Sequence, residues 1–369
     1  MTPLGEILAR RIAAEGPIRL DHFMAECLLN PAHGYYATRD PFGTAGDFIT
    51  APEISQMFGE MLGLALAQVW IDQGRPAPFL LVEPGPGRGT LMADMLRAMG
   101  SVPGMVAAAQ VHLIEASATL REIQAARLAG HPVTWHESVA SLPEGPVFLV
   151  ANEFLDALPI RQFERRGPAW CERQVRLGPA GGLAFGLTPP MEVAALTPRL
   201  ADTREGDVVE LCPAAPPFVA EIAARIAAHG GVAIFLDYGH WQSLGDTFQA
   251  LRGHAPVDPL AEPGAADLTA HVAFAPLARA ARAVGAEVSA MTAQGVLLER
   301  LGITARAQSL ARGLTGAALE AHIAAHRRLT HPAEMGQLFQ TLAIFPRTAP
   351  LPPGFDAASS SRPSDVDHA

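Results

Sequence analysis

The chain has 369 residues, which is enough for one large hydrophobic core or two smaller ones. Its 27 Lys and Arg residues against 37 Asp and Glu residues give a formal net charge of −10, and without a basic cluster the sequence argues against a nucleic-acid partner. Apolar residues make up 49% of the chain, yet no apolar run approaches the roughly 20 residues of a membrane span, so membrane insertion is not expected.

Residues 1–75 are expected to form a mainly helical N-terminal region. Apolar residues recur at helical spacing over 3–14, 20–29 and 53–70, and Asp21 is a plausible cap for the second helix. The first residues lack the basic-then-apolar layout of a signal peptide, so we expect a soluble intracellular protein.

The Gly- and Pro-rich segment 30–53 contains two of the three tyrosines of the chain, Tyr35 and Tyr36. Loops of this length are commonly functional, so we predict a lid over a neighbouring site, with Asp47 and Thr50 as candidate substrate contacts. The alternative is a surface loop whose tyrosines fill a core edge and whose Asp47 stabilises a turn.

A buried strand is predicted from Phe79 to Glu83, and it leads through a glycine-rich turn into a helix. The three glycines of the turn are Gly85, Gly87 and Gly89. A ligand can approach such a backbone closely, and the helix start offers free N–H groups. A dinucleotide fingerprint would need its third glycine where Thr90 stands. The carboxylate at the strand end instead favours a ligand that carries a cation, such as S-adenosylmethionine with its ammonium group.

Residues 76–160 repeat the alternation of strand and helix, which predicts parallel strands whose carboxyl ends meet at one crevice. Glu83, Glu115 and Asn152 would all face this crevice, and Glu115 could accept two hydrogen bonds from ribose hydroxyls. We therefore predict an α/β fold of the class I methyltransferase type, with a doubly wound, mostly parallel sheet that binds S-adenosylmethionine. A dehydrogenase and a relic that binds no ligand are the alternatives.

The second half of the chain is predicted to complete this fold. Residues 161–210 have the texture of an antiparallel, β-rich substrate region, and 211–346 return to the α/β pattern with a helical insertion. Residues 254–270 are expected to be a loop, and the Pro- and Ser-rich residues 347–369 a disordered tail. The three cysteines, Cys27, Cys171 and Cys212, are widely separated, so we expect free thiols and no metal site.

Five motifs in one order resemble the MidA family. They lie at residues 46–60, 83–90, 151–159, 235–239 and 267–272. The resemblance runs from the N-terminal helices to about Phe345 and implies an S-adenosylmethionine-dependent protein arginine methyltransferase. Mitochondrial members of the family act on a core subunit of respiratory complex I during its assembly, which implies such a subunit as the partner. The sequence departs from the family pattern within 264–274, so no role is carried over to that loop. The absence of a transit peptide points to a bacterial, cytoplasmic member.

Arginine methylation would require carboxylates beside the acceptor. A guanidinium stays protonated with its charge delocalised, so acidic groups must hold its planar fork and draw charge from the attacking nitrogen. Glu153 and Asp156 are the predicted catalytic pair, although both could instead cap the following turn. Asp237 and Tyr238 could line the acceptor site or cap another strand end. His271 could be a base, but a hydrogen-bonded structural role is the preferred interpretation.

Two other functions remain open at the level of sequence. A small-molecule methyltransferase would have a closed, apolar acceptor pocket where a peptide site would be an open acidic groove. A non-catalytic assembly factor would keep the fold alone, but the intact glycine turn and Glu115 argue against such a loss.

Overall fold

The computed structural model describes residues 2–38 and 50–358. Its centre is a nine-stranded sheet with the strand order β15-β17-β10-β5-β2-β3-β4, to which β14 and β16 add short pairings. The strands are β2 (Phe79–Pro84), β3 (Ala109–Ile114), β4 (Val133–His136), β5 (Val147–Asn152), β10 (Gly231–His240), β14 (Val272–Ala273), β15 (Ala286–Val288), β16 (Thr292–Ala293) and β17 (Phe339–Pro346). The strands from β4 to β10 are parallel, and β17 is antiparallel to β10 and β15. The predicted doubly wound, mostly parallel sheet is confirmed.

The order of the parallel strands reverses between β2 and β5. From β2 the chain moves outward through β3 and β4, and it then returns to the other side of β2 to form β5 and β10. In open α/β sheets, ligands bind outside the carboxyl ends of the strands at this reversal. The topology therefore places a site at the ends of β2 and β5.

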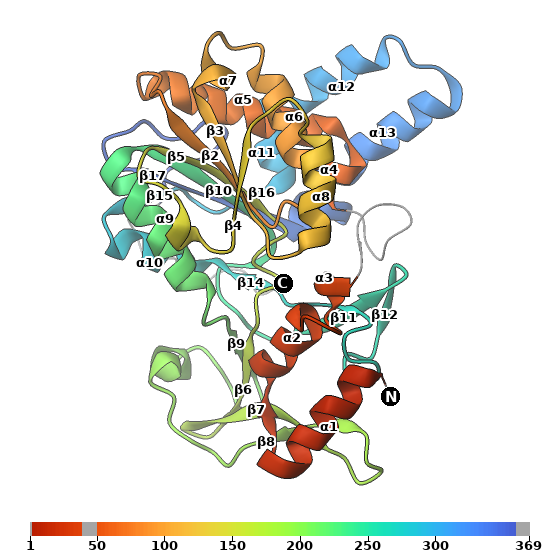
Figure 1. Cartoon of the computed structure of the whole chain (residues 1–369). Helices are drawn as coiled ribbons and strands as arrows, with labels where there is room; N and C mark the ends of the chain where they lie inside the picture. The colour runs from red at the N-terminus through yellow and green to blue at the C-terminus, as the bar shows by residue number, and fades with distance from the viewer. Residues whose placement is uncertain (1, 39–49, 359–369) are drawn as a thin grey trace.

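Helices cover both faces of the central sheet (Figure 1). One face packs against α5 (Gln56–Asp72), α6 (Thr90–Met99), α11 (Gln294–Leu301) and α12 (Ile303–Ala311), and the other against α9 (Ala215–His229) and α10 (Phe274–Ala283). This part also contains α4 (Ala51–Ile54), α7 (Met105–Ala108), α8 (Ala118–Arg127) and α13 (Gly316–Thr330). Among the described residues, no helix has the length and apolar character needed to cross a membrane.

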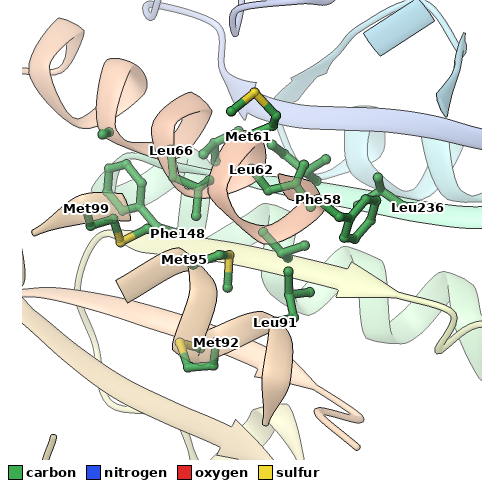
Figure 2. Close-up of a cluster of buried hydrophobic side chains, with 14 of the residues drawn as sticks. Phe58, Met61, Leu62, Leu66, Leu91, Met92, Met95, Met99, Phe148 and Leu236 are labelled. Atoms are coloured by element: carbon green, nitrogen blue, oxygen red, sulfur yellow. The ribbon is translucent and has the colours of Figure 1, made fainter. Parts of the chain in front are cut away.

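The largest apolar cluster joins α5 and α6 to the sheet (Figure 2). Its side chains include Phe58, Met61, Leu62, Leu66, Leu91, Met92, Met95, Met99, Phe148 and Leu236. The helices approach closely at Gly59 and Gly63, where an added Cβ would lie 2.6 Å from Asp94 Cβ and 2.8 Å from the Met95 carbonyl oxygen. Truncating one buried Leu or Met in such a cluster costs about 2–5 kcal/mol. This packing fixes α6, and with it the glycine turn ahead of α6.

The predicted β-rich insertion at 161–210 forms a second, antiparallel sheet that also takes in a strand from the N-terminal region. The strands are β1 (Ile18–Arg19), β6 (Arg161–Arg166), β7 (Ala169–Leu177), β8 (Leu183–Leu187) and β9 (Val208–Leu211). Helices α1 (Pro3–Glu15) and α2 (Leu20–Leu29) share an apolar cluster with this sheet, in the lower part of Figure 1. The predicted boundary at residue 75 thus does not separate two packing units, because α5 belongs to the central sheet.

Residues 254–270 are only partly a loop, because short strands form at 255–257 and 267–269 while 258–266 have no regular structure. A three-stranded antiparallel sheet consists of β11 (Gln249–Arg252), β12 (Ala255–Val257) and β13 (Asp267–Thr269). Each strand has only three or four residues and gains stability by pairing, which hydrophobic periodicity does not reveal. This sheet carries β13 towards the ends of the central strands.

Two further predictions need correction. Disorder is wrong for residues 347–358, because Phe355 is 6% exposed within the main apolar cluster and Ala357 bridges Ser289. Asp21 does not cap α2 but lies in its first turn and pairs with Arg19. The prediction of three free thiols is confirmed.

Candidate active site

A cavity of about 700 Å³ lies at the carboxyl ends of β2, β3 and β5. Its other walls come from α2, α3 (Tyr35–Thr38), α4 (Ala51–Ile54), α6, α8, β10, β11 and β13. The predicted site residues that line it are Thr50, Glu83, Gly85, Gly87, Glu115, Asn152, Glu153, Asp156 and Tyr238. Gly89 and Asp237 do not line the cavity, and Asp47 is outside the described residues.

The glycine turn between β2 and α6 has a left-handed backbone at all three glycines. The φ angles are 59° at Gly85, 51° at Gly87 and 76° at Gly89. Residues that carry a side chain rarely adopt this backbone conformation. At Gly85 space is also short, because an added Cβ would lie 2.9 Å from the Phe154 ring. Gly89 acts as the N-cap of α6 and so shapes the turn without reaching the cavity.

Glu83, near the end of β2, is 4% exposed and has one unsatisfied oxygen. Its carboxyl accepts a backbone hydrogen bond from Met92, while Oε2 has no partner among the described residues. Burial raises the pKa of this carboxyl well above its usual range. Buried polar atoms are normally hydrogen-bonded, so an open acceptor here fits a donor from a ligand.

Glu115 directly follows β3, and protein donors hold both of its oxygens. Ser117 N–H donates to Oε1 over 2.8 Å, and Gln124 Nε2 donates to Oε2 over 3.2 Å. Burial raises the pKa of Glu115, and these hydrogen bonds oppose the shift. These hydrogen bonds therefore fix the orientation of the Glu115 carboxylate at the carboxyl end of β3.

Gln124 of α8 is a site residue that the sequence did not reveal. It is fully buried, and its Nε2 also donates to the Gly87 carbonyl over 2.8 Å. Its Oε1 accepts a hydrogen bond from the Trp135 indole over 2.8 Å. Gln124 thus connects the glycine turn to Glu115. The available signal was a polar residue at helical spacing between two apolar ones, Leu120 and Leu128.

Glu153 lies just past β5 and holds the start of α4. Its Oε1 accepts from Ala51 N–H over 2.9 Å and from Asn152 Nδ2 over 3.0 Å. Glu153 therefore caps α4, not the turn that follows it. Burial, with a smaller contribution from the Asp156 charge, raises the pKa of Glu153 to about 7. Asn152 Oδ1 is buried and has no partner among the described residues.

A second contact also holds α4 in place. Glu53, another residue that was not predicted, accepts a 2.5 Å hydrogen bond from the Thr90 hydroxyl at the start of α6. Glu153 and Glu53 together attach α4 to the ends of β5 and β2. Thr50, the residue directly before α4, lies at the cavity wall.

Asp156 accepts a hydrogen bond from the Tyr238 hydroxyl and is 7% exposed. Burial raises its pKa to about 6. Asp237 has a different role, because its Oδ2 accepts from the backbone N–H groups of Leu155 (2.9 Å) and Asp156 (3.2 Å). Of the two roles considered for Asp237, capping is the one observed, whereas Tyr238 lines the cavity.

Three lining residues from distant parts of the chain complete this end of the cavity. Tyr36 of α3 donates through its hydroxyl to Asp267 Oδ1 over 2.8 Å, and Thr269 lies two residues farther along β13. Tyr36 and Asp267 both belonged to segments that the sequence marked as unusual, but no pattern joined them. His271 does not line the cavity, and its ring packs edge-on against Tyr238.

The cavity is strongly acidic. The acids that line it are Glu53, Glu83, Glu115, Glu137, Glu153, Asp156 and Asp267. Among the described lining residues, Arg88 is the one basic side chain. The described residues contain no cluster suited to a metal ion. The charge distribution therefore favours cationic organic ligands.

The residues present fit the predicted cofactor. S-adenosylmethionine offers an ammonium donor and ribose hydroxyls, and the unsatisfied acceptors Glu83 Oε2 and Asn152 Oδ1 lie beside a backbone turn without side chains. Glu115 stands at the end of the next strand, where a ribose-binding carboxylate is expected. One end of the cavity thus suits the cofactor, and we call it the cofactor end. The other end, lined by Tyr36, Glu153, Asp156, Tyr238, Asp267 and Thr269, we call the acceptor end.

Comparison with known sequences gives a consistent picture. Residues 61–292 match the profile of a family described as "Putative S-adenosyl-L-methionine-dependent methyltransferase". The mouse protein arginine methyltransferase NDUFAF7, mitochondrial, is 37% identical, and the match covers 94% of this chain and 85% of the mouse protein. The human protein of the same name is 36% identical, with 94% and 84% covered.

Comparison with solved structures agrees. A COG1565 superfamily protein from Burkholderia thailandensis, crystallised with S-adenosyl-homocysteine, superposes with a TM-score of 0.78 at 29% identity. The match covers 96% of this chain and 93% of that chain. A native crystal structure from the same organism gives a TM-score of 0.78 at 31% identity, with 96% and 92% covered.

Proposed function

This chain belongs to the MidA family of S-adenosylmethionine-dependent methyltransferases, the family of mitochondrial NDUFAF7, and we propose that it methylates an arginine side chain of a protein. The observation that carries the proposal is the continuity of the cavity, which joins the cofactor end to an acceptor end rich in carboxylates. A guanidinium is the side-chain cation that pairs with planar carboxylates in a bidentate manner.

At the cofactor end, Glu83 and Asn152 offer acceptors to the amino acid part of the cofactor, and Glu115 accepts from the ribose. Gly85 and Gly87 let the backbone come close, and Gly89 sets the start of α6. When bound, S-adenosylmethionine supplies an electrophilic methyl group on a sulfonium centre. The protein's task is to align the acceptor nitrogen with that methyl group and to exclude water.

At the acceptor end, Asp156 and Glu153 hold the guanidinium and draw its charge from the attacking nitrogen. Glu153 Oε1 is fixed by α4 and Asn152, so Oε2 is the oxygen assigned to the substrate. Tyr238 orients Asp156 by donating its hydroxyl hydrogen. Asp237 positions the loop that carries Asp156, because its carboxylate accepts from the backbone N–H groups of Leu155 and Asp156.

Apolar side chains form much of the cavity wall, and the acidic side chains among them support a cationic acceptor over a neutral small molecule. We propose a core subunit of respiratory complex I as the acceptor, in line with the MidA resemblance. The cytoplasm is the proposed compartment, although the relatives are named as mitochondrial proteins. Fractionation of cells that produce the full chain tests the compartment.

The direct test uses purified protein, S-adenosylmethionine with a labelled methyl group, and a lysate of cells that lack the enzyme. We expect one labelled protein band, with the label on an arginine identified by mass spectrometry. Calorimetry measures cofactor binding in parallel. Cofactor binding without label in any protein would overturn the proposed substrate class, and label in a small molecule would replace it.

A matched pair of variants controls this test. Glu83→Ala removes an unsatisfied buried acceptor of the cofactor end and is expected to abolish labelling with loss of cofactor binding. Glu262→Gln alters an exposed acid outside the cavity, paired with Arg252, and is expected to label as the wild type does.

A further inference from the structure

We propose that Leu29 and Pro31, at the end of α2, form a docking ridge for the segment of the acceptor protein that flanks the methylated arginine. The inference rests on the proposed function and adds the surface that would distinguish one protein arginine from another. The occupant is an extended segment that carries an apolar side chain close to the arginine.

The first observation is that Leu29 and Pro31 line two hollows at once. Both residues line the main cavity, and both also line a second hollow of about 400 Å³. The wall of the second hollow includes Arg11 of α1 together with His22 and Glu26 of α2. The two hollows therefore meet at the ridge, and a chain whose arginine enters the cavity can continue over it.

The second observation is that Leu29 is exposed at this opening. It is 55% exposed, whereas its neighbour Leu28 is 1% exposed and belongs to the apolar cluster shared by α1 and α2. Leu29 is not among the described members of that cluster. An apolar side chain that covers Leu29 would be stabilised there, because the contact removes apolar surface from water.

The third observation is that the ridge borders the acceptor end of the cavity. Helix α2 contacts α3 and β13, which carry Tyr36 and Asp267 of the acceptor end. The opening at Leu29 therefore leads to the carboxylates that are proposed to hold the guanidinium. An arginine that enters from this side brings its flanking residues onto the ridge.

The spacing of side chains in an extended chain then indicates which flanking residue lies on the ridge. Successive side chains point to opposite sides, so a residue two positions from the arginine points the same way, about 7 Å farther along the chain. A polar side chain there would lose water without gaining a hydrogen bond from the side chains of Leu29 and Pro31. The favoured substrate is thus an arginine with an apolar residue two positions away on one side.

The kinetic test uses the acceptor protein identified by labelling and compares the wild type with Leu29→Ala. We expect KM for the acceptor to rise about 3- to 10-fold, because complete burial of a leucine is worth about tenfold or more and Leu29 is 55% exposed. The Kd of S-adenosylmethionine should change less than about twofold, since Leu29 lies away from the cofactor end. Truncation of an exposed side chain should leave the fold intact.

Leu64→Ala is the matched control for this measurement. Leu64 is an exposed leucine of α5, with 41% exposure, and it lines neither hollow. We expect Leu64→Ala to keep the wild-type KM. An equal rise in both variants would overturn the inference.

A crosslinking experiment identifies the occupant of the ridge. A benzophenone attached to the new thiol of Leu29→Cys should crosslink to the acceptor protein about two residues from its arginine. Leu64→Cys, treated in the same way, measures the background from the native thiols and should not give this crosslink. Absence of the crosslink, a crosslink to a second copy of this chain, or an unchanged KM in Leu29→Ala overturns the inference. The proposed function still stands in those cases if the wild type labels an arginine, whereas a wild type that labels none overturns both.

Discussion

The cofactor end and the acceptor end of the cavity differ in how far apart their residues lie in the sequence. Glu83, Glu115 and Asn152, which all fall within 70 residues of the chain, lie at the ends of strands β2, β3 and β5. Tyr36 and Asp267 are separated by 231 positions and meet because α3 and β13 both contact α2.

The two ends also differ in how their polar atoms are satisfied. At the cofactor end, Glu83 Oε2 and Asn152 Oδ1 are buried acceptors without a partner among the described residues. At the acceptor end, Asp156 and Asp267 already accept from Tyr238 and Tyr36. Local turns thus shape the cofactor end, and a ligand would satisfy its open acceptors. At the acceptor end, tertiary contacts orient the carboxylates. Substitutions should separate these two behaviours.

The largest effect is expected for Gly85→Val at the cofactor end. The backbone there has φ of 59°, and the new Cβ would lie 2.9 Å from Phe154, so the turn must move. We expect cofactor affinity to fall by more than about 100-fold, because strained left-handed positions and overpacking each cost about 1–3 kcal/mol. Calorimetry measures the affinity. Gly182→Ala, which meets open space, is the control, and wild-type affinity in Gly85→Val would contradict the turn's role.

A large effect on turnover alone is expected for Glu153→Gln. The amide oxygen can still accept from Ala51 and Asn152, so α4 stays attached, but the charge beside the acceptor is lost. We expect kcat to fall about 100-fold, which is the lower limit of the rate contribution typical of a group that acts on the reacting atoms. The Kd of the cofactor should not change. Steady-state methyl transfer measures this. If Glu153→Gln keeps full turnover while Glu153→Ala does not, Glu153 only holds α4.

A smaller effect is expected for Gln124→Ala, which removes hydrogen bonds that support the glycine turn and Glu115 at the cofactor end. The change leaves the Trp135 indole and the Gly87 carbonyl without their partner and frees Glu115. We expect cofactor affinity to fall about tenfold, together with a lower Tm, since each unsatisfied buried group costs about 1–3 kcal/mol. Glu122→Ala, an exposed site on the same helix, is the control. An unchanged affinity would show that Glu115 holds its orientation without Gln124.

The smallest effect is a pH dependence confined to the acceptor end. Burial raises the pKa of Asp156 to about 6 and that of Glu153 to about 7. Below these values the carboxylates are neutral and hold a guanidinium poorly, so kcat/KM should rise several-fold with pH and level off above about pH 7. Asp156→Asn should lose the part of this rise that belongs to Asp156. A flat profile in the wild type would contradict the assignment.

The same shifts predict the sign of a stability effect. Because the folded-state pKa values lie above those of the unfolded chain, the neutral forms favour the fold, and this contribution is lost as pH rises through about 6 to 7. The ligand-free Asp156→Asn variant should therefore gain more stability relative to the wild type at pH 8 than at about pH 4, the unfolded-state value. Thermal unfolding at the two pH values checks the difference.

Most of the central sheet could be predicted because its signals are local. Apolar runs such as Phe79–Pro84 are buried on both faces of the sheet, and the glycine turn follows directly. The same locality identified Glu83, Glu115 and Asn152 as neighbours at the ends of adjacent strands. The short strands β11 and β13 were missed, because their stability comes from pairing with each other and not from their own periodicity.

The sequence by itself determined the doubly wound sheet, the glycine turn and the cofactor end, since parallel strands place their carboxyl ends at one edge. Only the tertiary structure decided the acceptor end. It placed Tyr36 in a hydrogen bond with Asp267 and Tyr238 in one with Asp156. It also showed that Asp237 binds backbone N–H groups and that Glu153 binds the start of α4. The physical reason is that contacts between distant segments depend on how separate sheets and helices pack, and no residue pattern along one segment encodes that packing.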